Sequence, residues 1–372
     1  MSTPSKLLLL ALAGTLAFGQ APRASSVRVN LPDDSPVSLL SADWGESRTS
    51  ERGSALVLNL NTSLSLKNTS QRRIRAISWL VLSQEATPGG RASVTKASLD
   101  IAPGETFPLR IDLRLLRPIG RALTPSVEMS LDGVLFEDLS FYGPNRLDSR
   151  RVMLAFELEA QRDRQYFQQV LAAQGPEGLR KECLASLSRQ GDLTRVDVQW
   201  ARGRTTAAGG DREVQFAFLR FPDAPVEPVA GMAHIAGPEA RAPQVEVQNR
   251  SRRAVRHLEM GWLLKDSRGR EFLAGSVPAK TNLNPGEKTQ VLADSTLRFS
   301  DAQGAALSIE GMTGFISQVE FADGSVWIPN RAALGDPRLQ RALAPSAEEM
   351  RLTSIYRKRG LNALLEELKK FQ

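Results

Sequence analysis

Cysteine and histidine are scarce in this chain of 372 residues, which holds one cysteine and two histidines. The single cysteine, Cys183, has no partner in the chain, so no intramolecular disulfide can brace the fold. Stability must therefore come from hydrophobic cores, and the length leaves room for two or three domains of ordinary size. Neither His234 nor His257 has a Cys, Asp or Glu at a strong zinc-ligand spacing, and we interpret His257 as a partly exposed strand residue.

Recognisable catalytic motifs are lacking as well. The sequence contains no P-loop, no Gly-x-Ser-x-Gly and no Gly-x-Gly-x-x-Gly string. A Ser-x-x-Lys string starts at Ser93, but it lies in a β-type region without the motifs that accompany it in serine acyl enzymes, so we attribute it to chance. We therefore predict a protein that is not an enzyme and has no catalytic residue, metal site or cofactor. An uncharacterised hydrolase is the third-ranked alternative.

Only one long apolar run is present, and it lies at the N-terminus, where Lys6 precedes residues 7–18 and small residues follow. This arrangement is typical of an export signal, so we predict a signal peptide over residues 1–21 and a periplasmic or secreted protein. An uncleaved membrane anchor is the alternative. No other stretch approaches the length that spans a membrane, so we expect no transmembrane segment in the mature chain.

The tripeptide Pro-Asn-Arg occurs twice, at residues 144–146 and again 185 positions later at residues 329–331. The same offset continues to match residues downstream, and upstream it drifts to 181 and 182 at the Asn-x-Ser and Pro-Gly-Glu strings. A long series of matches predicts an internal duplication. Asp132-Gly133 and Asp323-Gly324 are 191 apart, which predicts extra residues before the first Pro-Asn-Arg. The downstream pairs are Leu154/Leu339, Leu158/Leu343, Val170/Ile355, Gly175/Gly360, Leu179/Leu364, Glu182/Glu367 and Cys183/Leu368.

Each copy begins with apolar residues that alternate with other residues, the pattern of half-buried strands. Trp79 and Trp262 fall on these segments, and we expect both in a core. Short strands without intervening helices favour an antiparallel sandwich over a βαβ fold. The segments are Leu56–Leu60, Ile77–Val81, Val214–Phe218, Val245–Val247 and Leu258–Leu264.

The strings "SLKNTSQRRIRAISW" and "VEVQNRSRRAVRHLEMGW" resemble the strand-turn-strand core of immunoglobulin-like modules in exported bacterial proteins, including FxLYD domains. The resemblance implies a β-sandwich fold and leaves the function open, because sandwich folds host many functions.

After each Pro-Asn-Arg the apolar spacing becomes helical. Residues 151–173 predict one helix, which Gly175-Pro176 ends before a second, and Ser346 with Glu349 forms a capping box for a later helix. The last helix carries an apolar stripe, which we expect to dock on its own sandwich; an open face for a partner is the alternative. The stripe consists of Leu361, Leu364, Leu365, Leu368 and Phe371.

The predicted fold is therefore mainly β with helical segments: two tandem immunoglobulin-like antiparallel β-sandwich modules, each followed by an α-helical pair. The predicted boundaries are residues 25–146 for the first β module, 147–190 for its helices, 191–331 for the second β module and 332–372 for the last helices.

Arginines cluster in one turn of each predicted module, and guanidinium groups suit carboxylate and phosphate partners. We expect a non-enzymatic structural or protein-interaction protein of the bacterial cell envelope, whose partner is another envelope protein. The alternative is a binder of anionic polysaccharide or lipid headgroups through these turns; export argues against nucleic acid. A solvated turn without a ligand is the simpler interpretation of the same residues. The candidate anion-binding residues are Arg72, Arg73, Arg75, Arg250, Arg252, Arg253 and Arg256.

Overall fold

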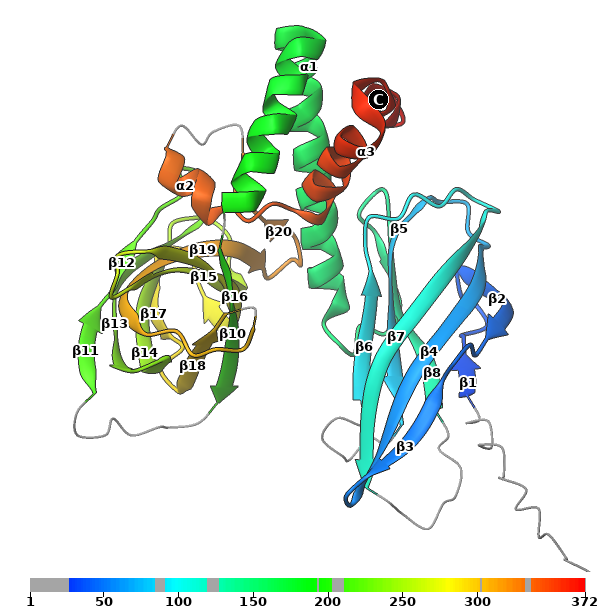
Figure 1. Cartoon of the computed structure of the whole chain (residues 1–372), viewed down its shortest axis with the longest axis horizontal. Coiled ribbons are helices and arrows are strands. Elements are labelled where there is room, and N and C mark those ends of the chain that lie inside the picture. Colours follow the sequence, from blue (N-terminus) through cyan, green and yellow to red (C-terminus); the bar gives the residue numbers. More distant parts are fainter. Residues whose placement is uncertain are drawn as a thin grey trace, which may run out of the picture. The chain divides into compact units, whose positions relative to one another are not determined.

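The computed structural model of the chain describes residues 27–83, 91–118, 127–192, 194–202, 211–301, 303–331 and 336–371. The predicted signal peptide lies outside these residues. Strands predominate over the described part, and three helices accompany them, so the prediction of a mainly β chain with helical segments is confirmed. The chain forms two units (Figure 1). Unit 1 holds the described parts of Met1–Ser70, Trp79–Val94 and Gly104–Leu131, and unit 2 holds those of Gln71–Ser78, Thr95–Pro103 and Asp132–Gln372.

A four-stranded antiparallel sheet lies entirely within unit 1. Its central strand is β4, which pairs along its length with β7 on one edge and with β2 and β3 on the other. Leu58, Leu60 and Leu64 are buried on one face of β4, as the alternation of the sequence predicted. The strands are β2 (Val37–Asp43), β3 (Arg48–Arg52), β4 (Ala55–Asn68) and β7 (Thr106–Pro118).

A second sheet has the order β1-β8-β5-β6, with β9 paired to β8. Trp79 of β5 is fully buried, as expected. The pairing of β1 with β8 is parallel, so the prediction of purely antiparallel strands is wrong at this edge. Strands β5, β6 and β8 contribute residues to both units. The strands are β1 (Val27–Asn30), β5 (Ile74–Leu82), β6 (Arg91–Lys96), β8 (Val127–Phe136) and β9 (Phe141–Tyr142).

The sheet of the second half has eleven strands and nearly closes on itself like a barrel (Figure 1). Its path is β11-β13-β14-β18-β10-β16-β15-β19-β12, with β17 on β14 and β20 on β19. Because β11 and β12 adjoin in the sequence and lie at opposite ends of this path, the two ends approach each other. The strands are β10 (Arg195–Arg202), β11 (Arg212–Gln215), β12 (Ala217–Phe218), β13 (Val226–Ala236), β14 (Glu239–Asn249), β15 (Val255–Asp266), β16 (Glu271–Leu283), β17 (Lys288–Val291), β18 (Ser295–Ser300), β19 (Ile309–Phe321) and β20 (Val326–Trp327).

This near-closure differs from the predicted open, purely antiparallel sandwich. The pairings β10–β16 and β12–β19 are parallel, and β10 pairs with β16 on one edge and with β18 on the other. One strand therefore links what would be two sheets of a sandwich. Trp262 is fully buried in the core of this structure, with Phe216 packed edge-on at 5.0 Å between ring centroids.

The helices are α1 (Ser149–Asp192), α2 (Pro337–Ala342) and α3 (Ala347–Lys369). Gly175 interrupts α1 with φ 68° and ψ −172°, and Gly360 interrupts α3 with φ 81° and ψ −179°. These backbone angles are open to glycine and almost closed to other residues, so each long helix consists of two helices joined at a kink. The sequence predicted the interruption at Gly175, whereas the short α2, capped by Asp336, was not predicted.

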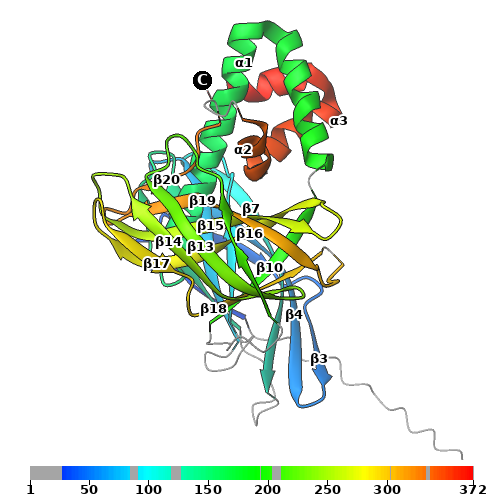
Figure 2. The same ribbon diagram turned by 90° about the vertical axis from the view of Figure 1, so that its left-hand side faces the viewer.

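Helices α1 and α3 pack against each other through a small apolar cluster (Figure 2). The apolar stripe of α3 therefore docks on α1, and the expectation that it docks on its own β module is wrong. The reason is that α1 carries a stripe of the same character, so each helix covers the face that the other would expose. None of the described helices is long and apolar enough to cross a membrane. The buried cluster consists of Phe167, Leu179, Cys183, Leu352, Leu364 and Leu368.

Turns at matching sequence positions share their hydrogen bonds. The N–H of Asn68 donates to the carbonyl of Glu105 over 2.9 Å, and the N–H of Asn249 donates to Glu287 over 3.0 Å. In each case the Asn side chain also accepts from the backbone N–H two residues later, at 3.0 and 2.9 Å.

A second pair of turns corrects the sequence alignment. The carboxylate of Asp138 accepts from the N–H of Ser140 over 3.0 Å, and that of Asp323 accepts from the N–H of Ser325 over 2.9 Å. The structural counterpart of Asp323 is thus Asp138, which lies 185 positions earlier, and not Asp132. The expectation of extra residues before the first Pro-Asn-Arg is therefore wrong.

Candidate functional site

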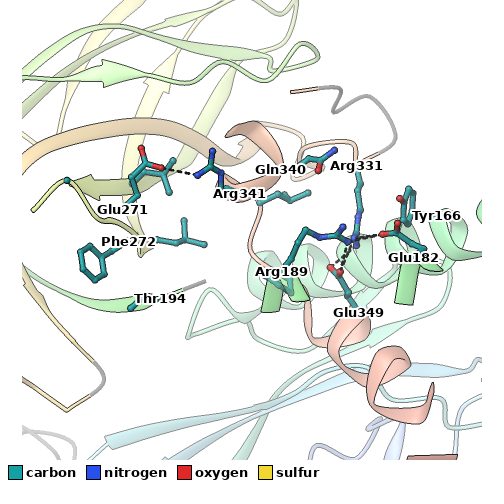
Figure 3. A pocket seen from close by; sticks show the side chains of 15 residues that line it. Tyr166, Glu182, Arg189, Thr194, Glu271, Phe272, Arg331, Gln340, Arg341 and Glu349 are labelled. Atoms are coloured by element: carbon teal, nitrogen blue, oxygen red, sulfur yellow. Dashed lines mark hydrogen bonds and ion pairs between the residues drawn. The ribbon is translucent and has the colours of Figure 1, made fainter. Parts of the chain in front are cut away.

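A cavity of about 680 Å³ lies within unit 2, between the helices and the strands β15 and β16. Figure 3 shows charged side chains from α1 and α3 on one side and residues of β16 and α2 on the other. The lining residues are Tyr166, Glu182, Arg189, Thr194, Leu263, Gly269, Glu271, Phe272, Leu273, Arg331, Gln340, Arg341, Leu343, Pro345 and Glu349.

Arg331, the last residue of the second Pro-Asn-Arg, is at the centre of the polar wall. Its guanidinium pairs with both oxygens of Glu349, at 2.7 and 2.8 Å, and lies 3.5 Å from Asp163 and 3.5 Å from Glu182. The group also lies over the ring of Tyr166, 4.5 Å from its centroid. Only 10% of the Arg331 side chain is exposed, so these pairs act in a poorly solvated setting and hold the guanidinium in one orientation.

Two further groups extend the polar wall toward solvent. Arg189 pairs with Glu182 at 2.8 Å and lies 3.6 Å from Glu349. The pKa of the Tyr166 hydroxyl is raised, first by burial and then by the negative charge of Glu182. Tyr166 therefore stays neutral around neutral pH and remains a hydrogen-bonding group on this wall.

Ser346 links the start of α3 to this wall. Its side chain accepts a hydrogen bond of 3.0 Å from the N–H of Glu349, which is the N-cap half of the predicted capping box. The Glu349 carboxylate does not complete the box; it accepts instead from the Ser186 hydroxyl and from Arg331. The Ser346 hydroxyl donates to Asp163 over 2.5 Å. The polar wall thus connects α1, α3 and the segment after β20.

The opposite wall is apolar. Leu263, Leu273 and Leu343 lie on it and also belong to the cluster in which α2 packs on β15 and β16. Pro345 extends this wall, and Phe272, whose side chain belongs to the core of the eleven-stranded sheet, also lines the cavity. Part of the second helical segment therefore does dock on its own β structure, through α2.

An ion pair lies at the outer part of the cavity. Glu271 of β16 and Arg341 of α2 are 3.4 Å apart, with 43% and 58% of their side chains exposed. An exposed pair at this distance contributes little to stability and can exchange partners readily.

A second buried ionic network lies elsewhere on the helices. Arg164 pairs with Glu157 at 2.8 Å and with Glu348 at 3.5 Å, and lies over the ring of Phe371 at 4.3 Å. Burial raises the pKa of Glu157, and one of its oxygens has no hydrogen-bond partner among the described residues. Phe371, the last residue of the predicted stripe, is thus covered by a guanidinium. Leu361 and Leu365 are half-buried at the edge of the α1–α3 cluster.

Most of the predicted anion-binding arginines form partly exposed ion pairs. Carboxylates lie beside six of the seven, and Arg75 has only 11% of its side chain exposed. The two turns are not brought together into one described site. The pairs are Arg72–Asp138 (3.6 Å), Arg73–Asp100 (3.0 Å), Arg75–Asp100 (2.6 Å), Arg250–Glu227 (3.0 Å), Arg253–Asp323 and Arg256–Glu320.

His257 and Cys183 are both buried. His257 is 6% exposed, so its interpretation as a partly exposed residue is wrong. Burial first, and then the charge of Arg151, lower its pKa to about 4. Burial raises the pKa of the Cys183 thiol to about 12, which makes it unreactive. Over the described part of the chain, His, Cys, Asp and Glu form no group of three or more that could hold a metal ion.

Sequence reasoning singled out Arg331, Glu182 and Glu349 through the repeat and the capping box, but it did not connect them. It missed Asp163 and the wall formed by Leu263 and Leu273. Asp163 stands on a helix among other charged residues, and no local pattern marks it as buried. The apolar residues of β15 and β16 look like ordinary core residues in the sequence.

Comparisons with known proteins identify no family. No family model matches the chain, and no curated protein matches it. One similar solved structure, "X-ray structure of Northeast Structural Genomics Consortium target SoR45", is 12% identical, with a TM-score of 0.21, over 28% of this chain and 76% of its own. A β-glucosidase from Kluyveromyces marxianus is 11% identical, with a TM-score of 0.13, over 71% of this chain and 45% of its own. Likenesses of this level carry no argument about fold or activity.

Proposed function

We propose that this protein is an exported, non-enzymatic interaction protein of the bacterial cell envelope that binds another protein. The observation that supports a binding role is the cavity beside α1 and β16. Its buried charged groups are held in mutual pairs around Arg331, and the facing wall is apolar. Groups fixed in this way form a preorganised recognition surface.

We also propose that the chain is built from two tandem immunoglobulin-like modules related by duplication, each followed by a helical pair. The matching turns at Asn68 and Asn249 and the matching kinks at Gly175 and Gly360 support this proposal. The α1–α3 cluster supports it further, because its six buried residues fall into three pairs separated by 185 positions: Phe167/Leu352, Leu179/Leu364 and Cys183/Leu368. Such pairing is expected where two copies of one helical segment pack face to face.

The alternative function, binding of anionic polysaccharide or lipid headgroups, receives less support. An arginine whose charge is balanced by a neighbouring carboxylate adds little net positive potential to attract another anion. Six of the seven candidate arginines are in this situation, so a structural role for both turns is favoured.

Two experiments test the proposal. N-terminal sequencing of the protein from its native host should begin near Gln20 or Pro22; intact Met1 in a soluble cytoplasmic fraction would contradict export. Affinity capture of the tagged mature protein from cross-linked envelopes should recover the same partner protein in repeated preparations, and capture from envelopes of cells that lack the tagged protein should not. Recovery of no protein above this control would contradict the binding role.

A further inference from the structure

We propose that the unit 2 cavity is a peptide-binding site that takes one large apolar side chain from an extended segment of a partner protein. This inference rests on the proposed function, because it presumes that the protein binds proteins. It adds the location of the site and the chemistry of the ligand.

The cavity has the size and the apolar wall that such a ligand needs. A volume of about 680 Å³ lies within the range of pockets that enclose compact ligands. One wall consists of Leu263 and Leu273 at the ends of β15 and β16, with Leu343 beyond them. This surface can remove an apolar side chain from water, and the anchor residues of protein contacts lie in well-packed, desolvated pockets of this kind.

The charges that line the cavity are balanced. Arg189, Arg331 and Arg341 line the cavity together with Glu182, Glu271 and Glu349, so the lining holds three cations and three carboxylates. A lining without net charge gives no strong attraction to an anionic glycan or phosphate headgroup. It offers donors and acceptors in similar number, as a peptide main chain does with its N–H and C=O groups.

The inner and outer charges of the cavity differ in their freedom to turn to a ligand. The inner pairs of Arg331 are buried and bidentate, so they stay in place. The outer pair, Glu271 and Arg341, is exposed and 3.4 Å apart, so either group can bond to a peptide at little cost. The cavity therefore combines a fixed polar wall with an adaptable outer rim.

The test uses the full mature protein and acetylated, amidated pentapeptides Ala-Ala-X-Ala-Ala with X = Leu, Phe or Gln, measured by titration calorimetry and ligand-observed NMR. We expect the Leu or the Phe peptide to bind with a Kd of about 1 mM or tighter. The Gln peptide should bind at least about tenfold more weakly, because burial of its side chain gains no apolar transfer energy.

Two tryptophan variants localise the binding. Thr194→Trp places a large ring at the rim without touching the core, since Thr194 is an exposed residue of the cavity lining. It should weaken binding of the apolar peptide at least about tenfold, by occupying the volume that the ligand needs. The matched variant Ser50→Trp, at an exposed position of β3 in unit 1, should leave the affinity unchanged.

The outcomes separate this inference from the proposed function. Failure of both apolar peptides to bind, or equal binding by Thr194→Trp and wild type, overturns the peptide site. Binding of dodecanoate or of a neutral oligosaccharide in place of the peptides, lost in Thr194→Trp, also overturns it and assigns the cavity to another ligand class. If the peptides fail while affinity capture still recovers a partner with Thr194→Trp, the proposed function stands and the partner binds elsewhere.

Discussion

The hydroxyl of Ser346 donates a hydrogen bond of 2.5 Å to the carboxylate of Asp163, and both side chains are almost completely shielded from solvent. The same carboxylate lies 3.0 Å from Arg162 and 3.5 Å from Arg331. We predict that Asp163→Ala destabilises the protein by about 3–5 kcal/mol, because it leaves buried guanidinium groups without their partner. Urea unfolding followed by circular dichroism measures the loss.

Asp294→Ala, at an exposed position, is the control and should stay within about 0.5 kcal/mol of wild type. A wild-type midpoint for Asp163→Ala would show that the polar wall contributes nothing to stability.

Trp262 is fully buried and its indole Nε1 has no hydrogen-bond partner among the described residues. We expect Trp262→Ala to cost about 3–5 kcal/mol through lost burial and a cavity. Trp262→Phe should cost clearly less, because it keeps a ring and removes an unsatisfied polar group. Trp79 is equally buried, and its indole nitrogen also has no hydrogen-bond partner among the described residues, so Trp79→Ala should again cost more stability than Trp79→Phe. Equal losses for Phe and Ala at both positions would contradict this account.

His257 should make stability depend on pH. Its pKa is lowered to about 4 in the folded protein, from an ordinary value of 6.5, by burial first and then by the charge of Arg151; Lys280 and Arg256 act in the same direction, and Asp148 opposes them. The folded state therefore favours the neutral ring. The contribution of His257 to the free energy of unfolding is complete above pH 6.5 and falls as the pH drops toward 4. The loss reaches at most about 3 kcal/mol.

The measurement is the unfolding free energy of wild type and of His257→Gln from pH 7.5 to pH 4.5. Taking the difference between the two proteins cancels the titration of the carboxylates that they share. The stability of wild type should decline more steeply than that of the variant between pH 6.5 and 4.5. Parallel curves would mean that His257 titrates normally.

The sequence predicted much of the fold because its signals are local. Alternation located β4, β5, β14 and β15, and Gly175 with Pro176 located the break in α1. The near-closed path of the second sheet was not predictable, since it depends on β11 and β12 pairing with strands distant in sequence. The cavity was not predictable for the same reason: Arg331, Glu182 and Phe272 come from three elements that only tertiary packing brings together.

Gly175 and Gly360 should be intolerant of side chains for backbone reasons alone. A Cβ at either position would meet no atom within 4 Å, yet φ is 68° and 81° with ψ near 180°. We predict that Gly175→Ala and Gly360→Ala each cost about 1–3 kcal/mol. Gly191→Ala is the control, because this residue also has open space around it but an ordinary φ inside α1. It should leave the thermal midpoint unchanged or raise it slightly. A similar loss in all three variants would point to something other than the backbone angle.

Phe167 of α1 and Leu352 of α3 are 185 positions apart and are both fully buried in the same cluster. Because the two side chains belong to one buried cluster, an exchange of the two residues should be tolerated better than either change alone. Phe167→Leu should cost about 1–2 kcal/mol by leaving a void, and Leu352→Phe about 1–3 kcal/mol by overpacking.

The double variant should be more stable than the sum of the two losses predicts, with a coupling energy of at least about 1 kcal/mol. Unfolding of the four proteins in urea completes this cycle. Simple additivity would show that the two side chains occupy separate volumes. It would place Phe167 and Leu352 away from the axis that relates the two helical segments, because in a face-to-face pairing only residues near that axis meet their own counterparts.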